Sequence, residues 1–437
     1  MKILLIITPF YPAQTPNTIR WDAIIHEFIN NGYEVTVLTT KWTKKEPFEE
    51  INGIKIYRAG HHTLLDFLWN KLGVNKRRNV SSFAKIKKSN FIVAKIERIV
   101  DRIWRKRYWP DGSVLFFEPG KKVINKIIRE DSITHVISVG LPFTCHLIAK
   151  QAKKNSPRLH WTMDVQDPFS ISDAFWVNNF SKYALRNIEA EQECLNAADE
   201  IVFTNTKVTE LYKELFGERS KNYSVIPPLF VMPQELNNES NQAEVGLILE
   251  EGKKHIAYFG SFYEGVRSPF RFLQFLDVLF KNYKASLFKM QFHFYGELNK
   301  FSKPIFLLFD HLSPYIQHHG FISHDKLTHY ISKYDILLNF GNTTNYHLPS
   351  KVVEFLYYNK PVINIVSIDD DSAKVFLKNK MDIFNIKLSS DISKDDAESF
   401  ISYVLQEQEK RDVSLKNVEE FLPKEISNLY LDLMKSV

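Results

Sequence analysis

The sequence of 437 residues contains only two cysteines, Cys145 and Cys194, and neither stands in a metal-ligand spacing. Disulfide frameworks and zinc ribbons are therefore excluded. No apolar run approaches the roughly 20 residues that a membrane-spanning helix needs. The apolar run after Lys2 has five residues, which is shorter than the roughly 7 to 15 of a signal-peptide core. We therefore expect this run to be a buried strand and the protein to be cytoplasmic.

The chain also lacks the Gly-x-Gly-x-x-Gly and Walker sequences. Their absence removes the best support for a dinucleotide or nucleoside-triphosphate site. Hydrophobic residues make up 44% of the chain and charged residues 25%, which is typical of a soluble globular protein. A chain of this length needs two or three domains rather than one core.

Strand-like runs alternate with helical patterns in the amino-terminal half, and the alternation restarts near residue 255. Such alternation predicts mostly parallel sheets with helices on both faces. A polar stretch at 231–254 separates the two series and is typical of a linker. We therefore predict an α/β protein with domains at 1–230 and 255–415 and a helical segment at 416–437. The carboxyl ends of the two sheets should face a cleft that binds the ligand.

The most informative stretch is 349–365, which begins like a helix and continues into an apolar strand. Ser350 can cap this helix, whose first N–H groups and positive dipole end favour a diphosphate. Glu354 lies one turn further on, and its carboxylate suits the two hydroxyls of a ribose. The pattern therefore predicts a nucleotide-sugar site. The alternative is a capped amphipathic helix with a solvated glutamate.

This stretch resembles the donor-binding segment of family 4 retaining glycosyltransferases, in which the equivalent of Glu354 holds the donor ribose. The resemblance implies the GT-B fold, two Rossmann-like α/β domains facing a central cleft, with a C-terminal helix at 416–437 packed on the first domain. It also implies a nucleotide-diphosphate sugar as donor, a glycan or lipid-linked acceptor, and no metal or other cofactor. Tyr346 departs from the family, which has a glutamate there. Asn342 or Asn345 would then orient the donor sugar.

The second predicted domain opens with a strand followed by Gly260, Ser261 and Arg267 before a helix. Glycine lets backbone approach a ligand, and the Arg267 fork suits a diphosphate whose charge grows as the glycosyl bond breaks. The segment resembles the phosphate-binding opening of the same family's second domain, so Arg267 and Lys351 are the expected electrostatic stabilisers. A turn glycine and a surface arginine are the alternative.

Two further segments, Gly296 and Gly320 with Phe321, follow predicted strands, where nucleotide contacts are expected. In the resembling family, the second of these segments touches the base largely through its backbone. For Gly320, a plain turn residue is the alternative.

In the first domain, Asp167 lies just past a predicted strand. Its run is similar to the Arg-Asp-Pro-Trp run of a subset of these transferases, with Gln166 in place of the arginine. A carboxylate there could orient an acceptor hydroxyl or assist its deprotonation, and the alternative is a residue that caps or turns the chain. Asn17 and Arg20 belong to the loop in the place of the family's acceptor and phosphate loop, although the customary Gly-Gly is missing.

Positive charge is concentrated in one segment. Residues 71–107 hold 13 Lys or Arg against two acidic residues, a balance of +11 in a chain of net charge +6. A helix at 91–104 would have an apolar face and a basic face, which suits an anionic membrane surface. The alternative is a core-facing helix, and no motif indicates nucleic acid. The residues predicted to meet the membrane or a lipid-linked acceptor are Lys95, Arg98, Arg102 and Trp104.

These observations predict a retaining glycosyltransferase of cell-surface polysaccharide or glycolipid biosynthesis, cytoplasmic and peripheral on the inner face of the cell membrane. The resemblance implies that the departing phosphate accepts the proton of the incoming hydroxyl. Two alternatives stay open: a nucleotide-sugar epimerase of the same fold, and a catalytically silent glycan-assembly partner, which Tyr346 favours. Asp369–Asp371 invites a metal site, but its position after a late strand predicts a helix cap.

Overall fold

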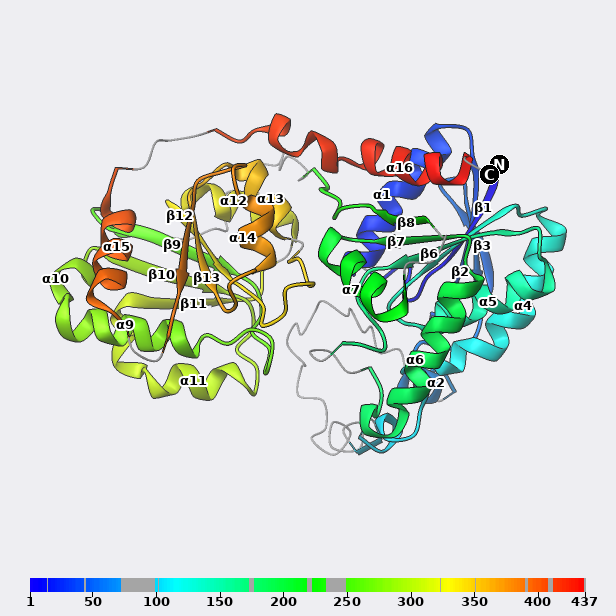
Figure 1. Ribbon diagram of the computed structural model, residues 1–437, viewed down its shortest axis with the longest axis horizontal. Helices are drawn as coiled ribbons and strands as arrows, with labels where there is room; N and C mark the ends of the chain where they lie inside the picture. The colour runs from blue at the N-terminus through cyan, green and yellow to red at the C-terminus, as the bar shows by residue number, and fades with distance from the viewer. Residues whose placement is uncertain are drawn as a thin grey trace. The chain divides into compact units, whose positions relative to one another are not determined.

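The computed structural model of the protein divides into two compact units, coloured from blue to red along the chain in Figure 1. Unit 1 comprises Met1–Val231 and Pro423–Val437, and unit 2 comprises Met232–Leu422. Within the described residues, no helix is long and apolar enough to cross a membrane. The structure describes residues 1–13, 15–42, 45–71, 99–100, 102–172, 177–217, 222–232, 249–322, 324–349, 351–389, 392–407 and 412–435.

Unit 1 is built on an eight-stranded sheet in the order β3-β4-β2-β1-β5-β6-β7-β8. Its neighbouring strands are parallel except for the β3–β4 pair. The order reverses between β1 and β5, and open α/β sheets bind ligands at the carboxyl side of such a switch point. The strands are β1 (Lys2–Ile6), β2 (Glu34–Thr39), β3 (Phe48–Ile51), β4 (Ile54–Arg58), β5 (His135–Val139), β6 (His160–Val165), β7 (Glu200–Phe203) and β8 (Asn222–Val225).

Helices lie on both sides of this sheet, with α1 and α16 on one side and α4, α5 and α6 on the other (Figure 1). The side chain of Thr15 caps α1 by accepting a hydrogen bond from the Thr18 amide at 3.1 Å, and Pro16 suits the first helical position. The helices are α1 (Pro16–Asn30), α2 (Leu64–Lys71), η1 (Val114–Phe116), α4 (Phe117–Glu130), α5 (Thr144–Asn155), α6 (Phe180–Ala197), α7 (Thr206–Phe216) and α16 (Pro423–Lys435).

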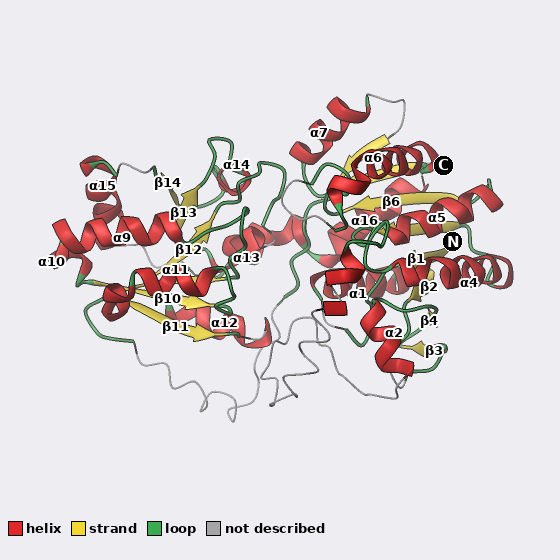
Figure 2. Ribbon diagram, turned by 90° about the horizontal axis from the view of Figure 1, so that it is seen from below, coloured by secondary structure: helices red, strands yellow, loops and turns green. Residues whose placement is uncertain are grey.

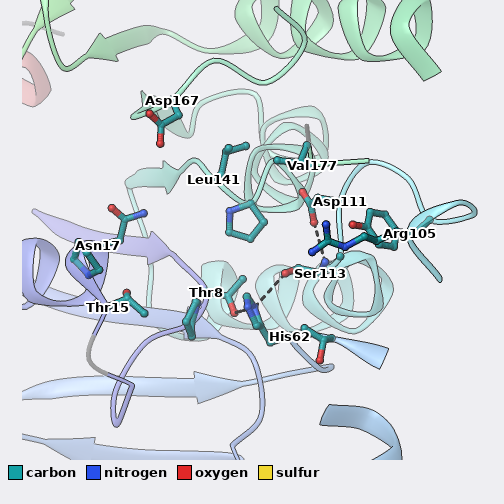
Figure 3. Close-up of a pocket in the computed structure, with 16 residues that line it drawn as sticks. Thr8, Thr15, Asn17, His62, Arg105, Asp111, Ser113, Leu141, Asp167 and Val177 are labelled. Atoms are coloured by element: carbon teal, nitrogen blue, oxygen red, sulfur yellow. Dashed lines mark hydrogen bonds between the residues drawn. The ribbon is translucent and has the colours of Figure 1, made fainter. Parts of the chain in front are cut away.

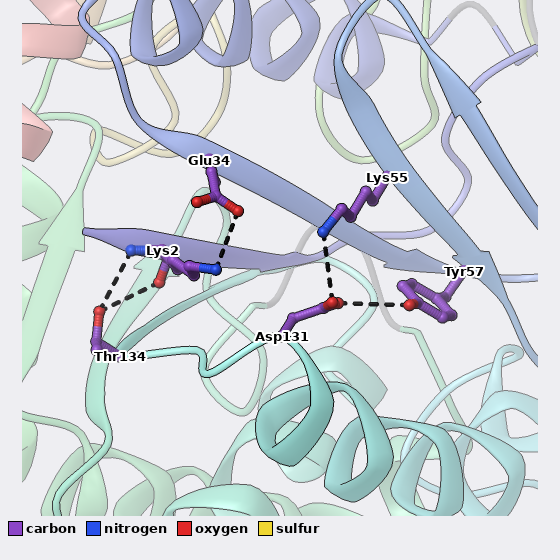
Figure 4. Close-up of polar contacts among 6 residues, drawn as sticks. All are labelled: Lys2, Glu34, Lys55, Tyr57, Asp131 and Thr134. Carbon is purple, nitrogen blue, oxygen red and sulfur yellow. Dashed lines mark hydrogen bonds and ion pairs between the residues drawn. The ribbon is translucent and has the colours of Figure 1, made fainter.

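Polar contacts join β1 to β2, and join β4 to the chain after α4 (Figure 4). Lys2 pairs with Glu34 at 3.1 Å, where β1 and β2 begin in register. Asp131 accepts from Lys55 and from the Tyr57 hydroxyl, both at 3.4 Å. Partly exposed pairs of this kind contribute roughly 0 to 1 kcal/mol each, so these contacts add little to the stability of the sheet.

Unit 2 contains a six-stranded parallel sheet in the order β11-β10-β9-β12-β13-β14. Its order reverses between β9 and β12, which places a second switch point there. Buried aromatic rings fill the core, with the rings of Phe272 and Phe340 meeting edge to face at 5.5 Å. The strands are β9 (Lys254–Phe259), β10 (Met290–Tyr295), β11 (Ile316–Gly320), β12 (Ile336–Phe340), β13 (Val362–Val366) and β14 (Ile383–Lys387).

Helices of unit 2 follow these strands in alternation, as Figure 2 shows in red and yellow. They are α9 (Phe270–Asn282), α10 (Lys284–Leu287), α11 (Ser302–Leu308), η2 (Asp310–Tyr315), α12 (His324–Lys333), α13 (Lys351–Tyr358), α14 (Ser372–Leu377), α15 (Lys394–Leu405) and η3 (Leu415–Phe421).

The predicted alternation of parallel strands and helices is confirmed, with two kinds of exception. Strands β3 and β14 were not predicted, because each is a sheet-edge strand with exposed or half-exposed positions and no long apolar run. The helical segment predicted at 416–437 is divided between η3 and α16. The division falls at Pro423, since proline starts a helix more readily than it continues one.

Candidate functional site

Two cations meet at the switch point of unit 2, beyond the carboxyl ends of β9 and β12. Arg267 ends a tight turn after β9, and its guanidinium donates to Asn342 Oδ1 at 2.8 Å and to the Tyr258 hydroxyl at 3.4 Å. Lys351 is the first residue of α13, and its ammonium donates to the Phe259 carbonyl at the end of β9. The structure thus brings together two residues that are 84 positions apart in the sequence, both predicted to face a phosphate.

The charges at this point are not balanced. Burial lowers the pKa of Lys351, while Glu354 opposes this shift and Arg267 reinforces it, so the charges of both side chains act on Lys351. In the described part of unit 2, no salt bridge to an Asp or Glu involves Arg267 or Lys351. Arg267 Nε is buried without a hydrogen-bond partner. Two cations with one nearby carboxylate leave an excess positive charge, which suits a polyanion.

Three predicted strand-end glycines also lie together. The Gly296 amide donates to the Gly320 carbonyl at 2.8 Å, and a Cβ on Gly296 would stand 2.1 Å from the Gly260 carbonyl oxygen. Gly296 and Gly320 have φ values of 132° and 72°, which favour glycine. Close packing of the strand-end loops therefore accounts for these glycines without a ligand. The other predicted contacts of this edge are Ser261, which is half-buried, Phe321, which is 52% exposed, and Ser350, which lies outside the described residues.

The loop after β12 is fastened to Arg267 by Asn342. Asn342 accepts from Arg267 through Oδ1 and donates through Nδ2 to the His347 carbonyl at 3.0 Å. Each end of the amide has one of these partners and keeps capacity for a second hydrogen bond, so the role of Asn342 in orienting the donor sugar stays a prediction. Asn345 donates to Asp370 at 2.5 Å, and Tyr346 is buried with 9% exposure. Asn342 thus positions Arg267, a contact that its distance in sequence concealed.

The three consecutive aspartates of unit 2 point to separate partners. Asp371 caps α14 by accepting from the Lys374 amide at 2.9 Å, which confirms the predicted helix cap. Asp369 pairs with Lys387 at 2.8 Å, and Asp370 accepts from Asn345. Among the described residues, no group of three His, Cys, Asp or Glu side chains could hold a metal ion.

Unit 1 has a pocket of about 620 Å³ at its own switch point, drawn in Figure 3. Thr8 after β1, His62 after β4, Leu141 after β5 and Asp167 after β6 line it, together with Asn17 from the first turn of α1. The fold thus brings the predicted residues Asn17 and Asp167 to one cavity. Its hydroxyl, amide and carboxylate groups match the hydrogen-bonding needs of a sugar.

Several pocket residues were not predicted. The ring of His62 lies with Nδ1 3.2 Å from the Thr8 hydroxyl and 3.1 Å from the Ser113 hydroxyl (Figure 3). Asp111 is buried and accepts from the Thr144 amide at 2.9 Å and from its hydroxyl at 2.8 Å. Burial raises the pKa of Asp111, and these hydrogen bonds oppose the rise. A sequence signal existed for His62, which closely follows a predicted strand, but none marked Asp111.

Arg20 does not line the pocket, which corrects its predicted contact with the acceptor. It is buried at 8% exposure, and its guanidinium donates to the Pro227 carbonyl at 2.9 Å and to the Tyr430 hydroxyl at 3.4 Å. It is one of the buried residues of α1, whereas Asn17 in the first turn of the same helix lines the pocket. Arg20 therefore holds α1 to the chain after β8 and to α16.

The basic segment is described only in part. Lys95 and Arg98 lie outside the described residues. Arg102 is exposed, and Trp104 is half-buried with its ring 5.9 Å from that of Tyr108. Arg105, which was not predicted, lines the pocket of unit 1. The basic segment therefore reaches the same pocket as Asn17 and Asp167.

Comparison with known proteins gives a fold but no sequence family. No family model matches the chain, and no curated protein matches it. Sucrose-phosphate synthase from Thermosynechococcus elongatus is 11% identical, with a TM-score of 0.60 and 100% of both chains covered. HepE from Anabaena, solved in complex with UDP, is 12% identical, with a TM-score of 0.57 and 100% of both chains covered.

A third structure extends the comparison. WaaG, a glycosyltransferase involved in lipopolysaccharide biosynthesis, is 10% identical with a TM-score of 0.50, covering 98% of this chain and 95% of its own. The chain therefore has the GT-B fold, with two parallel-sheet α/β units, and the fold-class prediction is confirmed. Its structural neighbours include GT-B glycosyltransferases.

Proposed function

We propose that this protein is a retaining glycosyltransferase of the family 4 type, which moves a sugar from a nucleotide diphosphate to an acceptor hydroxyl. The observation that carries the proposal is the meeting of Arg267 and Lys351 at the switch point of unit 2, with a positive charge in excess. This pair of residues, the cationic cradle, suits a diphosphate that gains negative charge as the glycosyl bond breaks in a chain with the GT-B fold. HepE, which shares the fold, was solved with UDP and glucose.

Each charged residue has a role in this proposal. Arg267, Lys351 and the first amides of α13 bind the diphosphate, and Glu354 accepts hydrogen bonds from the ribose hydroxyls. The strand-end loops at Gly260, Gly296 and Gly320 border the nucleotide. In unit 1, Asp167 orients the acceptor hydroxyl, and the departing phosphate takes its proton.

The acceptor in this proposal is a glycan or a lipid-linked glycan, as expected in cell-surface polysaccharide or glycolipid biosynthesis. The polar pocket of unit 1 and the basic segment that reaches it through Arg105 support that class. A catalytically silent assembly partner is the second candidate, because buried Tyr346 stands where the resembling family has a glutamate.

A panel of nucleotide-diphosphate sugars, incubated with mixed glycan acceptors in EDTA, tests the proposal. We expect transfer or slow donor hydrolysis to persist, because the cationic cradle supplies the charge that a metal would supply. Mass spectrometry of the products distinguishes the candidates. Epimerised donor would indicate an epimerase. Donors that all stay unchanged would indicate the silent partner. A strict need for manganese or magnesium would refute the proposal that Arg267 and Lys351 bind the diphosphate without a metal.

The lowered pKa of Lys351 predicts a pH dependence. Lys351 binds a diphosphate only while protonated, so the affinity for UDP should fall as pH rises through its pKa, which lies below the usual lysine value. Above pH 7 the UDP phosphates are already ionised, because their last pKa is about 6. Lys351→Arg keeps its charge and should remove the alkaline decline in calorimetric titrations between pH 7 and 10.

Lys360→Arg is the matched control, because Lys360 also donates to backbone carbonyls, those of Ser332 and Tyr334, beyond the other end of α13. It should keep the alkaline decline of the parent protein. An equal decline in Lys351→Arg would mean that another group titrates.

The basic segment supports peripheral binding to an anionic membrane. In its described part, Ile99 and Ile103 are 50% and 49% exposed, and Arg102 and Lys106 are exposed beside them. Each basic side chain near such a surface contributes about 1 kcal/mol. We expect the amount of protein that sediments with vesicles to rise as their content of anionic lipid increases. It should fall as the salt concentration increases.

A charge-reversal pair tests which residues are responsible. Arg102→Glu with Lys106→Glu should reduce co-sedimentation at least about tenfold, since each reversal removes one attraction and adds one repulsion. Lys416→Glu with Lys435→Glu makes the same change of net charge on exposed residues outside the segment. Equal losses in both pairs, or equal binding to neutral vesicles, would refute a membrane role of this segment.

A further inference from the structure

The C-terminal helix α16 reaches the base of the Asp167 loop through one hydroxyl group. Tyr430 donates to Asp164 Oδ1 at 3.2 Å, and the Gln166 amide donates to Asp164 Oδ2 at 2.9 Å. Asp164 lies in β6, and Asp167 follows it by three residues at the edge of the pocket. A chain of hydrogen bonds therefore runs from Tyr430 on α16 through Asp164 to Gln166, which begins the Asp167 loop at 166–168.

The direction of these hydrogen bonds is fixed by chemistry. The guanidinium of Arg20 can only donate, so the Tyr430 oxygen accepts from it at 3.4 Å and uses its own hydrogen for Asp164. Tyr430 and Asp164 are almost fully buried, at 1% and 0% exposure. Loss of the Tyr430 hydroxyl would leave Asp164 Oδ1 without this donor in a dry environment.

Docking of α16 does not depend on this hydroxyl. Ile426, Leu431 and Met434 are buried at 0 to 2% exposure on the same helix, and the Tyr430 ring lies 5.0 Å from that of Trp21. The apolar face therefore accounts for the packing of α16 on α1. The hydroxyl adds a directional link from α16 to Asp164 at the end of β6.

The far end of the loop has its own anchor. Buried Glu191 accepts from the Ser170 amide at 3.0 Å and from the Tyr212 hydroxyl at 2.6 Å. The rings of Phe169 and Phe143 stack at 3.9 Å. The stretch 166–168 thus lies between two fixed points, of which only the Asp164 point depends on the C-terminal helix.

We propose that Tyr430 is a positioning residue of the pocket in unit 1, which holds the Asp167 loop through Asp164 and Gln166. The C-terminal helix is then part of the acceptor site rather than only a cover for α1. The link to the acceptor rests on the proposed function, whereas the link to the loop does not.

Hydrogen exchange of the full-length Tyr430→Phe protein tests the link to the loop. The ring stays in place, so we expect amides in peptides covering 164–170 to exchange about fivefold faster, as one lost hydrogen bond allows. Exchange elsewhere in unit 1 and the affinity for UDP should not change. Gln166→Met breaks the same chain of hydrogen bonds at a partly exposed residue and should give the same local effect even if Tyr430→Phe folds poorly.

Tyr57→Phe is the matched control, because it also removes a tyrosine–aspartate hydrogen bond of unit 1, the one to Asp131 in Figure 4. It should leave the 164–170 peptides unchanged. Unchanged loop exchange in both Tyr430→Phe and Gln166→Met, or faster exchange spread over all of unit 1, would overturn the proposal.

A kinetic test uses any donor and acceptor that the panel yields. Tyr430→Phe should raise the KM for the acceptor about fivefold and leave the KM for the donor unchanged, a split that lost stability alone would not produce. Loop-specific exchange without any detectable transfer would support the positioning role and count against the glycosyltransferase instead. The positioning role of Tyr430 and the glycosyltransferase function can therefore be refuted independently of each other.

Discussion

Arg267→Ala should lower turnover by about two to three orders of magnitude, while the affinity for UDP falls by much less. The guanidinium of Arg267 already has partners in Asn342 and the Tyr258 hydroxyl, and its Nε is buried without a partner. Donors held in this way are most valuable when negative charge grows on the leaving diphosphate. The measurement compares kcat with the calorimetric affinity for UDP.

Arg271→Ala is the control for this variant. Arg271 is an exposed arginine on α9 that contacts Gln274 within its own helix, so its loss should change neither quantity. An equal fall of kcat and UDP affinity in Arg267→Ala would place Arg267 in ground-state binding only. If neither kcat nor the UDP affinity fell in Arg267→Ala, the diphosphate would bind somewhere other than this switch point.

Glu354→Ala should weaken UDP binding by about 1.5 to 3 kcal/mol, or about 10- to 150-fold, the usual range for hydrogen bonds to a charged group. Glu354 lies in the first turn of α13 and interacts with Lys351. Its proposed partners are the ribose hydroxyls, which gives a sharper test with 2′-deoxy-UDP. The parent should lose affinity for 2′-deoxy-UDP relative to UDP, and the variant should bind both nucleotides almost equally.

Glu398→Ala on the exposed face of α15 serves as the control and should bind UDP like the parent. Glu354 would have no role toward the ribose if its variant discriminated the two nucleotides as the parent does. Unchanged UDP affinity in Glu354→Ala would show that the donor site is misplaced.

Sequence reasoning predicted the part of the candidate site of unit 2 that local chemistry marks. Lys351 and Glu354 belong to one helix start, and Gly260, Gly296 and Gly320 lie at the ends of strands, so their places along the chain predicted that they share one sheet edge. Asn342 was predicted as a site residue, but its contact with Arg267 was not, because the two residues are 75 positions apart in the sequence. Hydrogen bonds between distant loops leave no periodic signal in a sequence.

The pocket of unit 1 was predicted less fully. Asn17 and Asp167 were placed at strand or helix ends, which parallel sheets gather at one edge, and both line the cavity. Arg20 was misjudged because the residues around it do not reveal that Pro227 and Tyr430 approach it. His62 is separated in the sequence from Arg105 and Asp111, and only folding brings it to the same pocket.

The sequence by itself determined the alternation of strands and helices, because buried parallel strands need continuous apolar runs and helix starts need residues such as Thr15 and Pro16. Tertiary structure alone decided which charges remain uncompensated. Arg20 and Arg267 are both arginines near a helix of a parallel sheet, yet Arg20 lies beside the Asp164 carboxylate, whereas Arg267 meets the neutral amide of Asn342. Whether a cation inside the fold has a carboxylate beside it depends on the partner that the fold brings to it, and that partner comes from a distant part of the chain.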